Sequence, residues 1–439
     1  MQWTEKQHEF EGIEGLRFGQ GRPSAALRGV RSVLHINDHG GQLGSTEQYI
    51  DSTSKALLSI GIESHLIYGQ LCGKLGHTFR STQCVGALSQ NRDNAEAFKQ
   101  ISRAVRALAP DLVFVHNIFD IGILEALLSP GRKYSLLWFI HDHHLTCLSE
   151  LRARLDTVNP ECRTPLSEKC LSNLKLGYCI QKHKEREYLG EDLLSRLDLL
   201  RFAKRADALI VPSQFMRGLL IRNLSELKSK IHVLPHPVSR PVREILPSAN
   251  RDYPSLLFNG RIAFEKGLHI ALEALMRLEF SQELLFTIAG PVQDERYWAH
   301  CKKLIHKAKQ LNPRLILHYV GNPDETQSEE LYRKADIVLL PSLWSEPHGK
   351  VCAEALAHGA AIIASNVGDL ATWIIPDKTG VLVRPKSSST LARAIKQLLE
   401  DANLRRELVL FGRELIRVRF TETEHFWALD EIVRRSRRI

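Results

Sequence analysis

Short apolar runs alternate with amphipathic stretches along most of the chain. The run RSVLHIND at residues 31–38 precedes a glycine-rich stretch and then EQYIDSTSKALLSIG, whose apolar residues recur at helical spacing until Gly61. Further strand-like runs are ESHLIYG, PDLVFVHN, SLLWFIHDHH, ADALIVPS and IHVLPHPV, several of them separated by helical stretches. Apolar runs of this length are typical of strands buried on both faces. This half of the chain therefore predicts a doubly wound parallel sheet.

The same alternation restarts near residue 255. The strand-like runs of this half are SLLFNGRI, ELLFTIAGP, LILHYVGN, ADIVLLPS, AAIIASNVG and GVLVRP. Between the halves, PHPVSRPVREILPSANRDYP is rich in proline and polar residues and predicts a linker near residues 237–254. We therefore predict an α/β protein of two similar doubly wound domains that face each other across a cleft, with a hinge between them.

The pattern divides the chain into four parts. These are an N-terminal extension at residues 1–30, an N-terminal domain at 31–240 with a cysteine-rich insertion at 147–179, a C-terminal domain at 250–415, and a final helix at 416–439. At 439 residues the chain is long enough for two or three domains, each with its own core. We expect the final helix to pack back towards the N-terminal domain.

Residues 341–368, PSLWSEPHGKVCAEALAHGAAIIASNVG, contain two acids in different settings. Glu346 lies in a proline-flanked loop after the run KADIVLLPS, whereas Glu354 lies in a helix expected from Gly349 to a C-cap at Gly359. Ligands of parallel sheets bind beyond the carboxyl ends of the strands, where this loop and the helix N-terminus would lie. The loop therefore suits a polyol that carries phosphate, since a carboxylate accepts hydrogen bonds from hydroxyls and a helix N-terminus favours a phosphoryl group. The alternative is a solvated loop acid and an exposed helix acid.

The stretch NGRIAFEKGLHIALEALMRL, from Asn259, places two cations at a strand–helix turn. Gly260 ends the strand, Arg261 and Lys266 follow, and a helix begins near Gly267. Arginine binds two oxygens at once and lysine acts as a point charge, so the pair suits a diphosphate. Exposed cations are the alternative, but a helix start is electrostatically unfavourable for them, which argues for an anion nearby.

Composition and charge limit the partners. The chain is 44% hydrophobic and 25% charged, with a formal net charge of +9 that favours anionic partners. No zinc finger, basic leucine zipper or aromatic sheet motif accompanies the charge, so we expect no nucleic-acid partner. The basic tracts KHKER at residues 182–186 and VRRSRRI at the end are solvated faces or contacts with an anionic membrane surface. No apolar run reaches membrane-span length and the N-terminal segment carries acids, so we expect a cytoplasmic protein, with peripheral contact at the inner face of the membrane as an alternative.

Four of the eight cysteines fall in one polar segment. Cys147, Cys162, Cys170 and Cys179 could hold a structural zinc ion tetrahedrally and so stabilise an insertion that lacks its own core. The spacings contain no C-x-x-C pair, so free or partly buried thiols are the favoured interpretation.

The segments NGRIAFEKG, VLLPSLWSEPHGKVCAEALAHG and NVGDLATWIIPDKTGVLVRP, in this order and spacing, resemble the C-terminal domain of retaining glycosyltransferases of the family-4 type, which have the GT-B fold of two Rossmann-like domains. The resemblance extends upstream through PDLVFVHN, IHDHH, ADALIVPSQFMR and HVLPHPV, so it covers nearly everything from Arg31 to the end. The E-x7-E spacing of Glu346 and Glu354, together with the Arg and Lys, is its most specific part.

The resemblance implies a role for each motif residue. Arg261 and Lys266, next to Gly260, would clamp the donor diphosphate. Glu346 would contact the hydroxyls of the donor sugar, and Glu354 would hold the nucleotide ribose. The backbone of His348, Gly349 and Lys350 would lie alongside the donor.

Two further assignments concern the N-terminal domain. His141, in IHDHH, matches the histidine that faces the reaction centre, with His143 and His144 as competing candidates. The resemblance also implies that Gly40 and Gly41, or Gly44, would form the glycine loop that approaches the donor phosphate. The family usually runs a glycine pair directly into x-E, whereas HGGQLGSTEQ has extra residues before Glu47.

The implied reaction is the transfer of a hexose from a nucleotide-diphosphate sugar to a hydroxyl of a glycan or lipid-linked acceptor, with retention at the anomeric carbon. Arg261, Lys266 and the helix end would stabilise the departing diphosphate, and no DxD-like acid pair stands out, so we expect no metal and no other cofactor. The alternatives are a catalytically inactive nucleotide-sugar-binding protein, a sugar phosphorylase or hydrolytic epimerase of the same architecture, and, on net charge alone, a nucleic-acid binder.

Overall fold

The computed structural model describes residues 27–41, 44–76, 78–89, 95–129, 131–181, 189–238 and 253–436. Most of the expected N-terminal extension and of the linker near residues 237–254 lies outside these ranges, and so does the basic tract at residues 182–186. In the part of the chain that is described, no helix is both long enough and apolar enough to cross a membrane.

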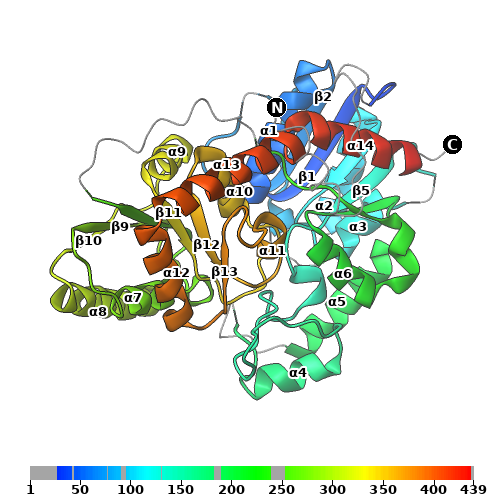
Figure 1. Ribbon diagram of the computed structural model, residues 1–439. Coiled ribbons are helices and arrows are strands. Elements are labelled where there is room, and N and C mark those ends of the chain that lie inside the picture. The colour runs from blue at the N-terminus through cyan, green and yellow to red at the C-terminus, as the bar shows by residue number, and fades with distance from the viewer. Residues whose placement is uncertain are drawn as a thin grey trace.

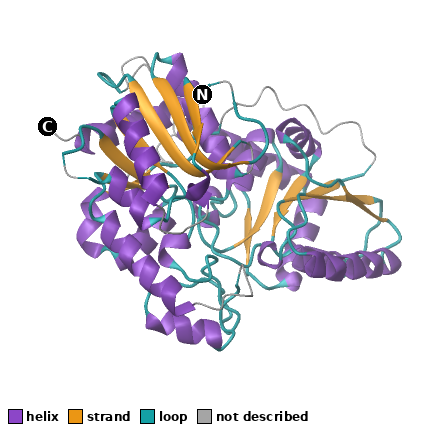
Figure 2. Ribbon diagram, turned by 180° about the vertical axis from the view of Figure 1, so that it is seen from behind, coloured by secondary structure: helices purple, strands orange, loops and turns teal. Residues whose placement is uncertain are grey.

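The described chain contains two parallel sheets, each flanked by helices (Figures 1 and 2). The seven-stranded sheet has the order β3-β2-β1-β4-β5-β6-β7, and its strands are β1 Ser32–Gly40, β2 Glu63–Leu71, β3 Ser81–Cys84, β4 Leu112–Val115, β5 Ser135–Phe139, β6 Ala208–Val211 and β7 Ile231–Val233. The six-stranded sheet has the order β10-β9-β8-β11-β12-β13, and its strands are β8 Ser255–Asn259, β9 Leu284–Ala289, β10 Leu315–Tyr319, β11 Ile337–Leu340, β12 Ala361–Ser365 and β13 Val381–Val383. Every strand pair is parallel. The expected strand-like runs all contain strands, whereas β3 was not predicted because its four residues are polar or exposed.

The helices of the N-terminal half are α1 Ser45–Ser59, α2 Ala95–Leu108, α3 Ile121–Leu127, α4 Glu168–Lys175, α5 Leu189–Ala203 and α6 Gln214–Asn223. Those of the C-terminal half are α7 Leu268–Leu275, α8 Glu295–Leu311, α9 Glu325–Lys334, α10 Lys350–His358, α11 Leu370–Trp373, α12 Ser388–Glu400, α13 Ala402–Arg419 and α14 Glu422–Ser436. Short 3₁₀ helices span Gly86–Ser89, His144–Thr146, Ser225–Lys230 and Phe264–Lys266.

Each sheet is covered on both faces because successive strand residues point to opposite sides. Along β1, Leu34 and Ile36 join the core beneath α2, α3, α5 and α6, while Val33 joins a second core with α1 and α14. In the other domain one core packs α7, α8 and α12 on the sheet, and a second core packs α9, α10 and α13. This is the doubly wound arrangement that the alternating runs predict.

The last helix returns to the N-terminal domain. In Figure 1, α14 lies beside α1 over the first sheet, at the end of the chain that has just completed the second domain. Leu429 and Val433 are buried with Leu57 of α1 and Phe114 of β4, and the Leu27 amide donates to Asp430 Oδ1 at 2.7 Å. The helix therefore connects the two domains by packing as well as by sequence.

The cysteine-rich insertion also connects the domains, since it leaves the first sheet after β5 and packs on the second domain. Leu151, Ala153 and Ile180 belong to the hydrophobic core of the C-terminal domain. Lys386 Nζ donates to the carbonyl of Arg154 at 2.8 Å, which adds a polar contact at the same place. These residues therefore use the core of the other domain, whereas Leu148, Leu166 and Leu174 of the insertion join the core of the N-terminal domain.

Leu429→Ala tests the packing of the last helix, because Leu429 is fully buried whereas Trp427 on the same helix is 38% exposed. We expect Leu429→Ala to lower the free energy of unfolding by about 2–5 kcal/mol through the lost burial and the cavity left behind. Trp427→Ala is the control and is expected to cost about 0.5 kcal/mol. Denaturant unfolding measures both, and equal costs would show that α14 does not pack as described.

Candidate functional site

A cavity of about 360 Å³ lies between the two domains. The N-terminal side is formed by α1 and residues 236–238, and the C-terminal side by α9 and α10. Its volume falls in the range of ordinary small-molecule sites. Of the residues expected to bind a donor, His348, Lys350 and Glu354 line it.

The loop at residues 341–349 is buried along its whole length. Glu346 is 8% exposed, so the interpretation as a solvated loop acid does not hold. At the end of the loop, Gly349 has φ +70°, and a Cβ there would lie 2.9 Å from Leu370 Cδ2, so only glycine fits this turn without strain. No side chain caps α10 at this end. The amides of Cys352 and Ala353 donate to the Gly349 carbonyl at 2.8 and 3.4 Å, so the first two amides of the helix, those of Lys350 and Val351, are the ones left for a ligand.

Glu346 is held as a carboxylate by a buried ion pair. Its Oε1 lies 2.7 Å from Lys266 Nζ and accepts a hydrogen bond of 2.7 Å from Ser342 Oγ. Burial alone would raise the pKa of Glu346, but the attraction of the Lys266 ammonium and these hydrogen bonds outweigh it and lower the pKa. Lys266 Nζ also lies 4.9 Å from the centre of the Trp344 ring, a cation–π distance. The structure therefore brings the expected sugar-binding acid and the expected phosphate-binding lysine together.

The other cation of the expected clamp has different partners. Arg261 forms an ion pair with Glu265 at 3.1 Å and hydrogen-bonds to Gln293, and its side chain stays 32% exposed. The two cations therefore have different carboxylate partners, Glu265 for Arg261 and Glu346 for Lys266. Gly260 lies just before Arg261, where its amide donates to the carbonyl of Ala289 at the ends of β8 and β9.

The residues of α10 form a second charged group. Lys350 Nζ is 3.2 Å from Glu354 Oε1 and also contacts Gln48 of α1, across the cleft. The hydroxyl of Tyr332 donates to Glu354 Oε2 at 2.8 Å. His348 is buried, its Nδ1 has no hydrogen-bond partner among the described residues, and burial lowers its pKa to about 3.

The three candidate histidines after β5 have distinct surroundings. His141 Nε2 lies 2.9 Å from His116 Nδ1 and its Nδ1 lies 3.3 Å from His236 Nε2, so other histidines engage both ring nitrogens. His143 Nε2 contacts the carbonyl of Ser345 at 2.5 Å, in the loop of the opposite domain. His144 stacks on a phenylalanine, and its Nδ1 lies 3.2 Å from a buried glutamate. Burial lowers the pKa of both His141 and His143 to about 4.

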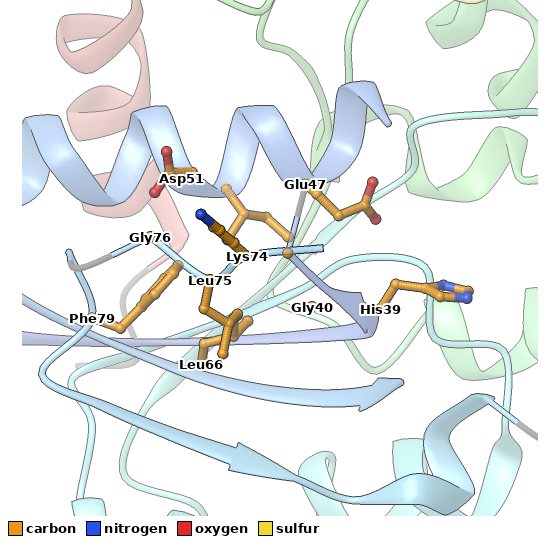
Figure 3. Close-up of a pocket in the computed structure, with 11 residues that line it drawn as sticks. His39, Gly40, Glu47, Asp51, Leu66, Lys74, Leu75, Gly76 and Phe79 are labelled. Carbon is orange, nitrogen blue, oxygen red and sulfur yellow. The ribbon is translucent and has the colours of Figure 1, made fainter. Parts of the chain in front are cut away.

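The glycine loop lies at the end of β1, beside a second and much smaller cavity (Figure 3). Figure 3 shows Glu47 and Asp51 projecting from α1, with Lys74 between this helix and the strands. The cavity measures about 20 Å³, which suits roughly one water molecule and no larger ligand. Gly41 lines it with φ +95°, where a Cβ would lie 2.2 Å from the Cys72 carbonyl oxygen. Residues 42 and 43 lie outside the described ranges, so the choice between Gly40 and Gly41 or Gly44 stays open.

Sequence reasoning missed two histidines of this site. His236 lines the large cavity and His116 lies behind His141, and the sequence analysis gave neither of them a role. The signal was present, because both follow the carboxyl end of a predicted strand, as His141 does. The three histidines meet because of the order of the strands in the sheet, and the sequence alone does not give that order.

The four cysteines of the insertion are free thiols, like the chain's other four. Among the described residues, no group of three or more His, Cys, Asp or Glu is arranged to hold a metal ion. Burial, followed by the influence of the other three cysteines, raises the pKa of the Cys179 thiol to about 12. The structural zinc stays the less favoured interpretation of these four residues.

Two family models match the chain. Residues 46–240 match the Glycosyltransferase Family 4 model, and residues 244–415 match the model described as Glycosyl transferases group 1. The glycogen synthase of Mycobacterium tuberculosis (strain ATCC 25618 / H37Rv) is 35% identical over 147 residues, which are 33% of this chain and 34% of that protein. The lipopolysaccharide 1,2-N-acetylglucosaminetransferase of Salmonella typhimurium is 28% identical over 206 residues, 44% of this chain and 53% of that protein. The chain thus spans about a third to a half of these curated relatives.

Solved structures share the fold over nearly the whole chain. Sucrose-phosphate synthase from Thermosynechococcus elongatus aligns with a TM-score of 0.66 at 20% identity, over 92% of this chain and 98% of that one. Anabaena Alr3699/HepE in complex with UDP aligns with a TM-score of 0.66 at 16% identity, over 92% and 99%. With the two parallel sheets, these likenesses confirm the predicted GT-B fold.

The buried histidines predict how stability depends on pH. Burial lowers the pKa of His35 and His348 to about 3, and of His141 and His425 to about 4, from an ordinary 6.5. Between about pH 6.5 and 4 the unfolded chain binds protons that the folded chain does not, so stability falls as the pH falls through this window.

His425→Gln should reduce that slope by about one proton, or about 1.4 kcal/mol per pH unit. The control His306→Gln changes an exposed histidine of α8 and should leave the slope as it is. Denaturant unfolding at several pH values measures the slope, and equal slopes in the two variants would contradict a buried neutral His425.

Proposed function

This chain belongs to the family-4 type of glycosyltransferases, and from this premise we propose that it transfers a hexose from a nucleotide-diphosphate sugar to a glycan or lipid-linked acceptor, with retention at the anomeric carbon. The observation that carries the proposal is the buried pair of Lys266 and Glu346 beside the uncapped N-terminus of α10. A cation, a hydroxyl-binding carboxylate and unused N–H groups meet there, which are the groups that a sugar diphosphate requires.

Glu346 is the proposed contact of the donor sugar. Its lowered pKa keeps it ionised at neutral pH, so it acts only as an acceptor and suits the hydroxyls of a hexose. Ser342 and Lys266 both bind Oε1, so we propose Oε2 as the oxygen that contacts the sugar. The fixed position of the Glu346 carboxylate supports recognition of one arrangement of sugar hydroxyls, because the carboxylate cannot move to meet hydroxyls in other positions.

Lys266, Arg261 and the start of α10 are the proposed diphosphate site. Lys266 is already held near Glu346, so a bound diphosphate would receive a positioned charge. Arg261 is exposed enough to turn from Glu265 towards an anion. Glu354, which Tyr332 holds by a hydrogen bond, is the proposed partner of the ribose. The UDP and UDP-glucose complexes of Anabaena Alr3699/HepE support a donor of this class.

In the proposed reaction, negative charge grows on the departing diphosphate, and the two cations and the helix end stabilise it. The bond between the anomeric carbon and the phosphate oxygen breaks while the acceptor oxygen bonds to that carbon from the same face. The acceptor's proton passes to the departing phosphate oxygen, so no separate base is required. Because the clamp supplies positive charge, we propose that the transfer needs no metal ion.

The acceptor is proposed from charge and from one relative. A net charge of +9 favours an anionic acceptor or an anionic membrane surface that carries it. The relative from Salmonella is a lipopolysaccharide transferase, which supports a lipid-linked glycan in polysaccharide biosynthesis.

Lys266→Ala tests this function. We expect the release of nucleoside diphosphate from UDP-, GDP- or ADP-glucose to fall about 100-fold or more, because the variant loses the main cation that stabilises the negative leaving group. The matched control is Lys396→Ala, which removes an exposed lysine with a glutamate partner four residues on and should keep full turnover.

Lys266→Ala leaves Glu346 buried without its cation, which destabilises a protein in its own right. The double variant Lys266→Ala/Glu346→Gln removes that charge, and circular dichroism checks its fold. A folded double variant should remain inactive. Normal turnover in Lys266→Ala would disprove the clamp, and absence of donor turnover in the folded wild-type protein would favour the inactive binding protein.

A further inference from the structure

Four histidines form a continuous hydrogen-bonded row beneath the inter-domain cavity, which we call the histidine row. His35 Nδ1 is 3.1 Å from His116 Nε2, His116 Nδ1 is 2.9 Å from His141 Nε2, and His141 Nδ1 is 3.3 Å from His236 Nε2. His35 belongs to β1, and the others follow β4, β5 and β7. Four separate segments therefore supply one row.

Each contact joins Nδ1 of one ring to Nε2 of the next. A neutral imidazole has one N–H and one lone pair, so each ring must donate on one side and accept on the other. Burial lowers the pKa of all four rings, which keeps them neutral. Only two arrangements then satisfy every contact, one with all four protons on Nδ1 and one with all four on Nε2.

Ser54 closes the inner end of the row. It is fully buried on α1, and its Oγ lies 3.4 Å from His35 Nε2. A hydroxyl donates or accepts, so Ser54 is compatible with both arrangements. Because Ser54 is buried, we assign the row a positioning role and not the conduction of protons through the protein.

His236 forms the outer end of the row and lines the inter-domain cavity. It stacks on Tyr49 with ring centres 4.4 Å apart and lies 4.6 Å from the ring of His348. Its Nδ1 has no hydrogen-bond partner among the described residues, whereas both nitrogens of His141 are engaged. A ligand in the cavity therefore finds a ring nitrogen on His236 and none on His141.

We propose that His35, His116 and His141 are positioning residues that set the tautomer of His236, and that His236 is the histidine that contacts the ligand. With protons on Nδ1, His236 donates to an anionic or hydroxyl oxygen; with protons on Nε2, it accepts from a hydroxyl. The identity of that ligand as a nucleotide sugar or its acceptor rests on the proposed function. The histidine row itself is independent of that function.

The test is ¹⁵N NMR of the full chain with ring-labelled histidine, with signals assigned by their loss in single variants. The row predicts ¹⁵N–¹⁵N couplings across all three contacts, with the proton on the same kind of nitrogen in each ring. His116→Phe keeps an aromatic ring and should abolish the two couplings that involve His116 while the coupling of His141 to His236 persists. Absent couplings in the wild-type protein, or neighbouring rings with protons on opposite kinds of nitrogen, would overturn the proposal.

Ser54→Ala tests whether the hydrogen bond at the inner end of the row determines the tautomer of His236 at the outer end. Without Ser54 Oγ, an Nε2–H on His35 would be a buried donor without an acceptor, so all four rings, His236 included, should carry the proton on Nδ1. The control Ser64→Ala removes an equally buried hydroxyl that has no hydrogen-bond partner in the described structure, and should leave the wild-type tautomers unchanged. A His236 that keeps its proton on Nε2 in Ser54→Ala would disprove the relay.

The ligand contact is tested by titration with UDP, GDP and ADP, with calorimetry to confirm binding. A nucleotide that binds should shift the His236 ring signals, and should shift those of His35 in the wild-type protein but not in His116→Phe. Binding without any shift at His236 would overturn the contact. If no nucleotide binds while the three couplings are present, the proposed function fails and the row stands.

Discussion

Parallel pairing of strands is the constraint on which the site depends. It forces the carboxyl ends of neighbouring strands to one edge of each sheet, and five residues of the site follow such ends. His116, His141 and His236 follow β4, β5 and β7, while Arg261 and Glu346 follow β8 and β11. Residues that are far apart in the sequence therefore meet without any local motif that joins them.

Contacts between the two domains bury the residues at these edges of the sheets. The insertion after β5 packs on the C-terminal core, and Ser345 donates from Oγ to the carbonyl of Arg152 at 2.9 Å, next to Glu346. Lys350 contacts Gln48 of α1 on the other side of the cavity. This packing excludes water from the loop at residues 341–349, so the pair of Lys266 and Glu346 interacts more strongly than it would at the surface. The same burial explains why the histidines of the site are neutral, because a charged imidazole is costly in such surroundings.

Much of the fold follows from local pattern. The apolar runs predicted the strands, and the helix expected from Gly349 to Gly359 is α10, Lys350–His358. β3 was missed because it is a short exposed edge strand without an apolar run. For the site, the end of the apolar run before Pro341 indicated the loop that carries Glu346, and the apolar spacing after Gly349 indicated the helix that carries Glu354. The sequence pattern could not predict which residues contact one another in the site. Lys266 pairs with Glu346 across 80 residues, and the histidine row depends on the order of strands in the sheet.

The central claim is that the cleft binds a nucleotide-diphosphate sugar through Lys266. It is tested most directly by thermal unfolding of the wild-type protein and of Lys266→Ala with UDP-, GDP- and ADP-sugars. A ligand that binds only the folded state raises its stability by about 2.7 kcal/mol at 100 times its dissociation constant. We predict that one donor raises the melting temperature of the wild-type protein and that this rise disappears in Lys266→Ala. No rise with any donor, or an equal rise in both proteins, would contradict the account.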